Sequence, residues 1–163
     1  MRDPESFDDF YAGSVGRVIS QLYAMTGDRA EAEDVVQEAY TRAWERWAKI
    51  ASYADPESWV RTVAWRISVS SWRKARSRLA AHRRDSRPDP VPEVSPDYVA
   101  LISALRVINS DQRRAVVLYH LVGLSVQEIA RETGASPAAV KARLVRGRQA
   151  LAAQLQEEAS LHV

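Results

Sequence analysis

The segment from Trp59 to Arg78 has the residue types that contact nucleic acid, because three tryptophans alternate there with six lysines and arginines. Cations neutralise phosphates, and aromatic faces stack on unpaired bases with roughly 1–3 kcal/mol per base. Trp59, Trp65 and Trp72 also recur near helical spacing, so packing in a core is the alternative for each. The segment as a whole predicts a surface for melted DNA, with these candidate residues: Trp59, Arg61, Arg66, Arg73, Lys74 and Arg76.

A second basic segment, residues 124–148, has the pattern of a helix-turn-helix. Ser125 and Glu128 predict a capping box that begins one helix, and Gly134 can adopt the left-handed conformation that ends it. Ser136 predicts the cap of a second helix, whose cations are separated by small residues. A helix that enters a major groove about 12 Å wide needs this combination, although a helical hairpin with a solvated basic face is the alternative. The candidate DNA-binding residues are Lys141, Arg143, Arg146 and Arg148.

A third candidate surface is the polar side of a helix expected over about residues 29–48. Apolar residues recur along it at steps of three and four, and acidic and polar residues occupy the opposite side. A solvated face is the default interpretation, and no histidine lies near enough in sequence to indicate a metal site. The candidate residues are Asp34, Gln37 and Glu38.

The sequence contains no evident enzyme site. His82, His120 and His162 are widely separated, and no nucleophile–base pair or carboxylate–metal pattern recurs. The chain has no cysteine, which excludes a disulfide framework and a Cys-based zinc site. We therefore expect no catalytic residues, no metal or other cofactor and no small-molecule substrate.

Charge is distributed in blocks, although the net charge is only +2. Residues 1–58 hold 12 acidic and 6 basic residues, whereas residues 59–87 hold 9 basic residues and one acidic residue. Residues 88–111 are acidic again, and residues 112–163 are basic. Such blocks indicate separate surfaces for separate partners, with the basic blocks as candidates for binding polyanions.

Four prolines within Pro88–Pro96 divide the chain. Their rings block backbone hydrogen bonds and disfavour helix in the residues before them, so this segment cannot be helical. We expect a flexible, extended linker over residues 81–96. It would join two small helical domains, residues 1–80 and 97–163, in an all-α fold whose second domain is the helix-turn-helix.

Helical periodicity fills both domains, and no strand pattern is present. In the first domain, Gly27 and Asp28 mark a break between helices. The helices expected there cover residues 4–25 (one or two helices), about 29–48 and about 57–78. The four short helices expected in the second domain cover about 98–107, 110–122, 125–133 and 136–155.

No stretch of about 18 apolar residues is present, and the acidic amino terminus lacks the apolar core of a signal peptide. We therefore expect a cytoplasmic protein that does not insert into a membrane.

The chain resembles the extracytoplasmic-function (ECF) sigma factors of bacterial RNA polymerase. The resemblance rests on the segment Asp34–Tyr40, read Asp-Val-Val-Gln-Glu-Ala-Tyr, followed in order by the Trp/Arg segment, a linker and a terminal helix-turn-helix. It covers nearly the whole chain and implies sigma region 2 at about residues 3–80 and region 4 at about 97–155. It also implies a function: binding core RNA polymerase and directing it to promoters.

The resemblance implies a partner for each surface. Asp34, Gln37 and Glu38 would dock on the clamp helices of the polymerase β′ subunit, and the second domain would bind the β flap. An anti-sigma factor that covers the polymerase- and DNA-binding faces is a further partner implied by the family.

The resemblance also assigns promoter elements to the two basic segments. The loop Ile50–Asp55 and the helix from Trp59 would recognise and help melt the −10 element. The terminal helix would read the −35 element, where Lys141 and Arg146 align with base-reading positions. The other two cations of that helix would grip phosphates or neighbouring residues.

One departure from the family pattern concerns Arg66, which stands where many relatives carry asparagine, so base preference at this position is not implied. The alternative function is a stand-alone helix-turn-helix regulator that binds duplex operator DNA. It explains the second domain but leaves the Trp/Arg segment and the Asp34/Gln37/Glu38 face without a role.

Overall fold

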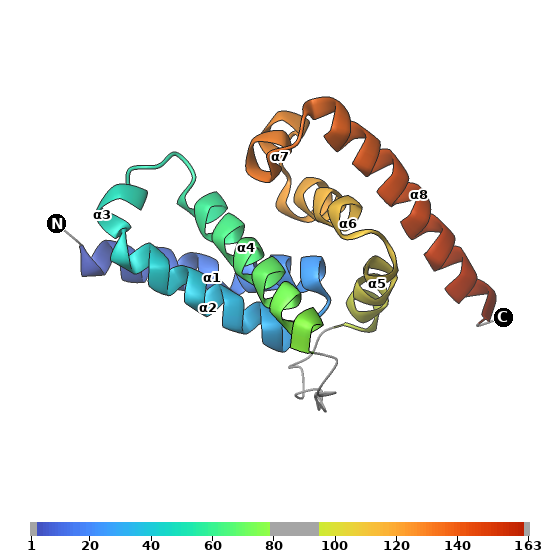
Figure 1. Ribbon diagram of the computed structural model, residues 1–163, viewed down its shortest axis with the longest axis horizontal. Coiled ribbons are helices and arrows are strands. Elements are labelled where there is room, and N and C mark those ends of the chain that lie inside the picture. Colours follow the sequence, from blue (N-terminus) through green and yellow to red (C-terminus); the bar gives the residue numbers. More distant parts are fainter. Residues whose placement is uncertain (1–2, 79–94, 162–163) are drawn as a thin grey trace. The chain divides into compact units, whose positions relative to one another are not determined.

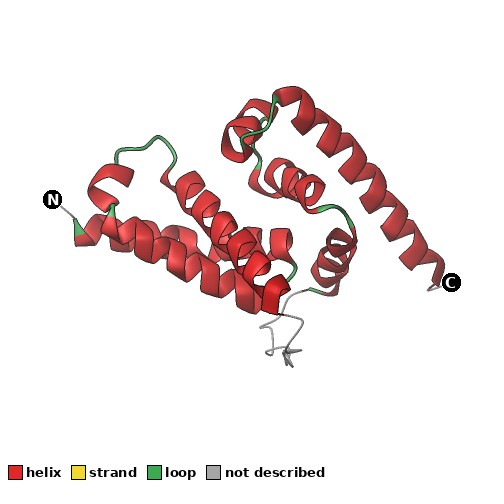
Figure 2. Ribbon diagram, in the orientation of Figure 1, coloured by secondary structure: helices red, strands yellow, loops and turns green. Residues whose placement is uncertain are grey.

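The computed structural model describes residues 3–78 and 95–161, and the side chains of residues 76–78 lie outside that description. Every regular element in these segments is a helix, which confirms the predicted all-α fold (Figures 1 and 2). The chain divides into two compact units, Met1–Glu93 and Val94–Val163. The linker predicted at residues 81–96 lies outside the described residues, except for its last two positions.

The first unit consists of α1 (Pro4–Thr26), α2 (Arg29–Glu45), α3 (Trp47–Ile50) and α4 (Pro56–Arg78). Helices α1 and α2 form a hairpin, and α4 packs against both of them. Gly27 makes the hairpin turn possible because its φ of 76° lies in the left-handed region. Asp28 then caps α2 by accepting the Glu31 N–H at 3.1 Å, as predicted.

The core of the first unit is built from the inner faces of these helices, and its fully buried residues include Val18, Leu22, Val36 and Val60. Phe7 and Phe10 of α1 pack on Trp47, with ring centroids 5.3 and 4.9 Å apart. This packing explains why the helix predicted over residues 29–48 ends at Glu45. Arg46 has a non-helical backbone, and the new direction of the chain carries Trp47 into the aromatic cluster.

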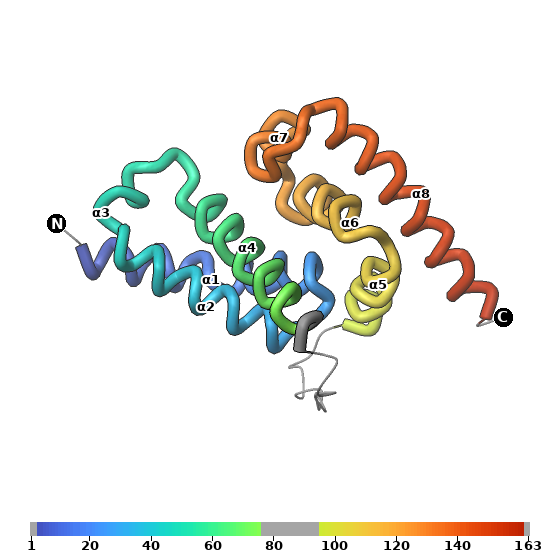
Figure 3. The backbone as a smooth tube through the Cα atoms, in the orientation of Figure 1, coloured from blue at the N-terminus to red at the C-terminus, as the bar shows by residue number. Residues whose placement is uncertain are grey.

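The second unit consists of five helical elements joined by short turns (Figure 3). They are α5 (Pro96–Val107), α6 (Ser110–Val117), the π-helical turn η1 (Leu118–Val122), α7 (Val126–Thr133) and α8 (Pro137–Leu161). The two described residues of the predicted linker, Ser95 and Pro96, lie at the start of α5. Pro96 is the first residue of the helix, and Ser95 caps it, because Ser95 Oγ accepts the Tyr98 N–H at 3.2 Å.

Two boundaries in the second unit differ from those predicted. The helix expected over residues 110–122 changes to a π turn at Leu118, which keeps Leu118 buried while Tyr119 and Leu121 are turned outward. Helix α8 continues to Leu161, well past the predicted end near residue 155, because α5 packs against it and extends its supported length.

Candidate nucleic-acid interface

Helices α7 and α8 form the predicted helix-turn-helix. Ser125 Oγ accepts the Glu128 N–H, and a Glu128 carboxylate oxygen accepts the Ser125 N–H, both at 3.1 Å. Hydrogen bonds from Ser125 to the Glu128 carboxylate lower the pKa of that carboxyl because they favour its charged form. Gly134 ends α7 with a φ of 73°, and Ser136 Oγ accepts the Ala139 N–H at 3.1 Å. The predicted capping box, turn and second cap are therefore confirmed.

Helix α8 is fixed in place by its inner side. Val140 and Leu144 are buried, as their spacing predicts. Gly147 lies directly against α6, where a Cβ atom would be only 2.8 Å from Val116 Cγ2 and 3.3 Å from the Gln112 carbonyl oxygen. This close approach sets how far the outer side of α8 projects from the unit.

The four candidate cations of α8 have different surroundings. Lys141 and Arg146 are exposed, and Arg143 is half-buried. Arg148 is also exposed, but its Nε donates to Nε2 of His120 at 3.0 Å. The Arg148 side chain therefore contacts a neighbouring residue of its own unit, which is one of the two roles that the family resemblance implies for it.

Arg148 joins α8 to the π turn through two contacts. Besides the bond to His120, its guanidinium lies 5.1 Å from the centroid of the Tyr119 ring. The two rings of the turn pack edge to face, with centroids 4.9 Å apart. The sequence contained no local signal for this cluster, because 28 residues separate its two hydrogen-bonded members.

We expect His120 to titrate below the ordinary histidine pKa of 6.5, because burial and the charge of Arg148 both disfavour the imidazolium. The unfolded chain then takes up this proton at a higher pH than the folded chain. The stabilisation from His120 is thus complete above about pH 6.5 and is lost as the pH falls through the lower, folded-state pKa. NMR titration of the imidazole measures this value, and Arg148→Gln should move it upward. An unchanged pKa in that variant would contradict the coupling.

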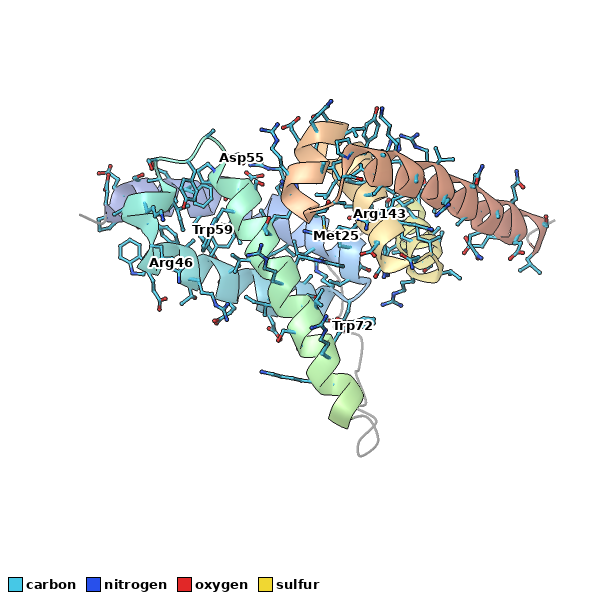
Figure 4. The ribbon with its side chains drawn as sticks, turned by 45° about the horizontal axis from the view of Figure 1, so that its top comes forward. Met25, Arg46, Asp55, Trp59, Trp72 and Arg143 are labelled. Carbon is cyan, nitrogen blue, oxygen red and sulfur yellow. The ribbon has the colours of Figure 1, made fainter. Side chains whose placement is uncertain are left out.

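The outer side of α4 carries most of the candidates for melted DNA. Trp59, Arg66 and Arg73 are seven residues apart, so they lie along one helix face. Arg66, Arg73 and Lys74 are exposed, and Trp59 is half-buried against the core. Figure 4 shows Trp59 near the start of α4, next to the loop that contains Asp55. The Arg76 side chain lies outside the described residues.

Arg61 is the exception on α4, and the prediction that it contacts DNA is wrong. The residue is only 2% exposed, and its Nη1 donates to Gln21 Oε1 of α1 at 3.2 Å. It shares the inner face of α4 with Val60 and Ala64, both fully buried. The spacing of three and four residues among these positions indicates the inner face of α4. A cation at one of them made Arg61 look like a surface residue.

Glu31 ties the second half of α4 to the start of α2. Its carboxylate accepts the Trp72 indole N–H at 3.1 Å and the Ser68 hydroxyl at 3.3 Å. Burial raises the pKa of the Glu31 carboxyl, and these two hydrogen bonds oppose that effect. Trp72, which is labelled in Figure 4, is 47% exposed and therefore does not pack in the core.

The polar face of α2 is open to solvent. Asp34, Gln37 and Glu38 are all exposed. Glu38 accepts a hydrogen bond from Arg42 Nε at 3.1 Å, and Gln37 Nε2 donates to the Tyr11 hydroxyl of α1 at 2.8 Å. The three predicted residues therefore share one accessible surface, and Tyr11 borders it from a helix that sequence reasoning did not associate with it.

Within the described ranges, no three histidine, cysteine or acidic side chains are grouped so as to hold a metal ion. None of the described helices combines the length and apolar character needed to cross a membrane.

Comparison with known families assigns a different match to each unit. Residues 10–78 match the family described as Sigma-70 region 2, and residues 98–151 match Sigma-70, region 4. Together the two matches include all three candidate surfaces, those of α2, α4 and α8. A stand-alone helix-turn-helix regulator is not favoured, because the first unit also has a sigma-factor match.

Curated relatives carry the same two regions. The ECF RNA polymerase sigma factor SigL of Mycobacterium tuberculosis is 34% identical over 141 residues, covering 82% of this chain and 79% of that protein. SigJ of the same species, also an ECF RNA polymerase sigma factor, is 32% identical over 151 residues. That match covers 84% of this chain and 47% of the longer SigJ.

Solved structures share the fold. The sigma factor RpoE from Bartonella quintana, in complex with the anti-sigma factor NepR, aligns with a TM-score of 0.79 at 22% identity. The alignment covers 92% of this chain and 96% of that one. CnrH, in complex with the cytosolic domain of CnrY, aligns with a TM-score of 0.63 at 23% identity, covering 95% and 90% of the two chains. With both regions present in order and a curated relative matched along most of its length, the chain belongs to the ECF sigma factors of RNA polymerase.

Proposed function

We propose that the two units of this sigma factor divide promoter recognition between them, with the first unit also carrying the main contact to core RNA polymerase. The observation that carries this proposal is the presence of two separate basic surfaces, the outer sides of α4 and α8, on units that match regions 2 and 4. The first surface would hold the melted −10 element, and the second would read the −35 element.

The polymerase contact is proposed for Asp34, Gln37 and Glu38 of α2, docking on the clamp helices of β′. Their exposure supports it, as does their position on a different helix from the cations of α4. An acidic surface on α2 attracts a basic partner and repels DNA, so the two contacts do not compete. The second unit would bind the β flap.

On α4 and its preceding loop, Trp59, Arg66, Arg73 and Lys74 would contact the −10 region. Two modest DNA contacts on one polymerase scaffold act through effective concentration, so the free chain would bind DNA weakly. The protein would work in the cytoplasm without catalytic residues of its own, since the chemistry belongs to the polymerase. An anti-sigma factor that covers these faces is a further proposed partner.

Run-off transcription with purified core polymerase on genomic fragments tests the function directly. We expect start sites that appear only when the chain is added, and mapping them yields the promoter sequence. A gel shift with and without core polymerase supplies the contrast with a simple regulator. Tight dimeric binding to duplex DNA without polymerase, together with no run-off product, would overturn the proposal.

We expect Arg146→Ala to reduce discrimination between the −35 element and single-base variants of it by roughly 1–3 kcal/mol, the range for loss of a base contact. Holoenzyme affinity for a panel of −35 variants measures the effect. Arg143→Ala is the comparison, because Arg143 lies half-buried on the same helix. Uniform weakening of all sequences by Arg146→Ala would identify a phosphate contact instead.

A further inference from the structure

The second unit contains a buried cation that its own fold leaves without a hydrogen-bond acceptor. Arg113 lies on α6 and is only 7% exposed. Its Nε atom is shielded from solvent and has no hydrogen-bond partner. Within residues 3–78 and 95–161, no acidic side chain forms an ion pair with it.

A second positive charge makes the situation of Arg113 less favourable. Arg106 of α5 carries the same sign, and burial together with this neighbour lowers the pKa of Arg113. An arginine stays protonated in proteins despite such effects. The free chain therefore holds a charge that is partly removed from water and has no counter-charge, which costs free energy that a bound anion would recover.

We propose that Arg113 receives a carboxylate from a protein partner, an aspartate or glutamate side chain of core RNA polymerase. A guanidinium offers two parallel N–H donors to a carboxylate, and a buried guanidinium gains most from such a partner because water screens the pair least. The inference rests on the proposed function, because it assigns a residue to the polymerase contact of the second unit, besides the contact assigned to α2.

Duplex DNA suits a buried guanidinium less well than an acidic side chain does. Its phosphates belong to a stiff, convex backbone, and they are met by cations that project from a protein surface. Lys141 and Arg146 of α8 are exposed in that way, whereas Arg113 is not. The degree of burial is thus the observation that separates a carboxylate from a phosphate.

Arg113→Met is the variant that tests the proposal, because methionine fills similar space without a charge. If Arg113 has no acceptor in the free chain, the variant should raise the Tm of the second unit by about 4–8 °C. The same variant should weaken binding of the full chain to core polymerase by about 30-fold, as expected for loss of a buried charge pair. Thermal unfolding read at the amide signals of α6 and α8 gives the first value, and titration with core polymerase gives the second.

The matched control is Arg131→Met on α7, where the replaced cation is exposed. It should change neither the Tm by more than a degree or two nor core affinity by more than about twofold, because exposed charges contribute little. Arg113→Lys keeps a charge without the two-donor geometry and should still lose most of the affinity for polymerase.

Three results would overturn the inference. A lower Tm for Arg113→Met would mean that the guanidinium stabilises the free fold. Unchanged affinity for core polymerase would mean that no carboxylate binds there. Weaker duplex binding with a salt dependence reduced by one phosphate, and unchanged core affinity, would identify a DNA contact. Glu38→Arg is measured in parallel. If Glu38→Arg also leaves core affinity unchanged, the proposed polymerase surface of α2 is rejected. If Glu38→Arg lowers core affinity and Arg113→Met does not, only the role of Arg113 is rejected.

Discussion

Replacing Glu38 by arginine should weaken binding to core RNA polymerase by about 30-fold or more, because a like charge placed in an interface costs several kcal/mol. The substitution reverses one of the two negative charges on the exposed face formed by Asp34, Gln37 and Glu38. Run-off transcription should fall with it, since a sigma factor acts only when bound to polymerase. Titration of the labelled chain with core polymerase measures the loss.

The fold should tolerate this change. Glu38 is half-exposed, and its one ion pair, with Arg42 four residues later, is of a kind that contributes about 0.3–0.5 kcal/mol. Asp9→Arg is the control: Asp9 is also an exposed acidic residue of the first unit, but it belongs to α1. Equal loss of polymerase affinity in both variants would show a general charge effect, and no loss in Glu38→Arg would reject the proposed surface.

Replacing Gly147 by valine should destabilise the second unit by about 3 kcal/mol, the upper part of the range for overpacking a close contact. Any Cβ at this position meets Val116 Cγ2 at 2.8 Å and the Gln112 carbonyl oxygen at 3.3 Å. Val116 is buried and its side chain has little rotamer freedom, so α8 must move away from α6. Because Arg146 directly precedes Gly147 on α8, specific −35 binding should fall together with stability.

A control variant and the position of the tryptophans distinguish this effect from a general loss of stability. Gly13→Val is the same substitution in an exposed part of α1 where nothing lies within 4 Å, and it should leave stability unchanged or slightly higher. All five tryptophans belong to the first unit, so their fluorescence follows that unit alone. Gly147→Val should lower the Tm measured at α6 and α8 amides and leave the fluorescence transition in place. An unaltered second unit would show that α8 and α6 can separate without cost.

Much of the fold was predictable because it depends on residues close together in the chain. The capping box of Ser125 and Glu128, the left-handed Gly134 and the cap at Ser136 each involve neighbours within four positions. The inward placement of Val140 and Leu144 follows from helical spacing alone. These local features were sufficient to predict a helix-turn-helix with a basic outer side.

Boundaries were less predictable where packing changes the course of a helix. The sequence continues to favour helix through Arg46, but a break there places Trp47 among Phe7 and Phe10. The π turn at Leu118–Val122 is similar, because it keeps one apolar residue buried and turns the next three outward. In both cases a contact with a distant segment outweighs the local preference.

The sequence by itself determined the order of the surfaces: a polar face on α2, a Trp/Arg helix and a terminal helix-turn-helix. The tertiary structure decided what each cation does. Arg61 binds Gln21 inside the first unit, Arg148 binds His120, and Arg113 is buried without an acceptor. Composition shows how many charges a segment carries, whereas burial and partners depend on elements tens of residues away. Since a guanidinium interacts strongly only with groups a few ångströms from it, its role is set by the fold around it.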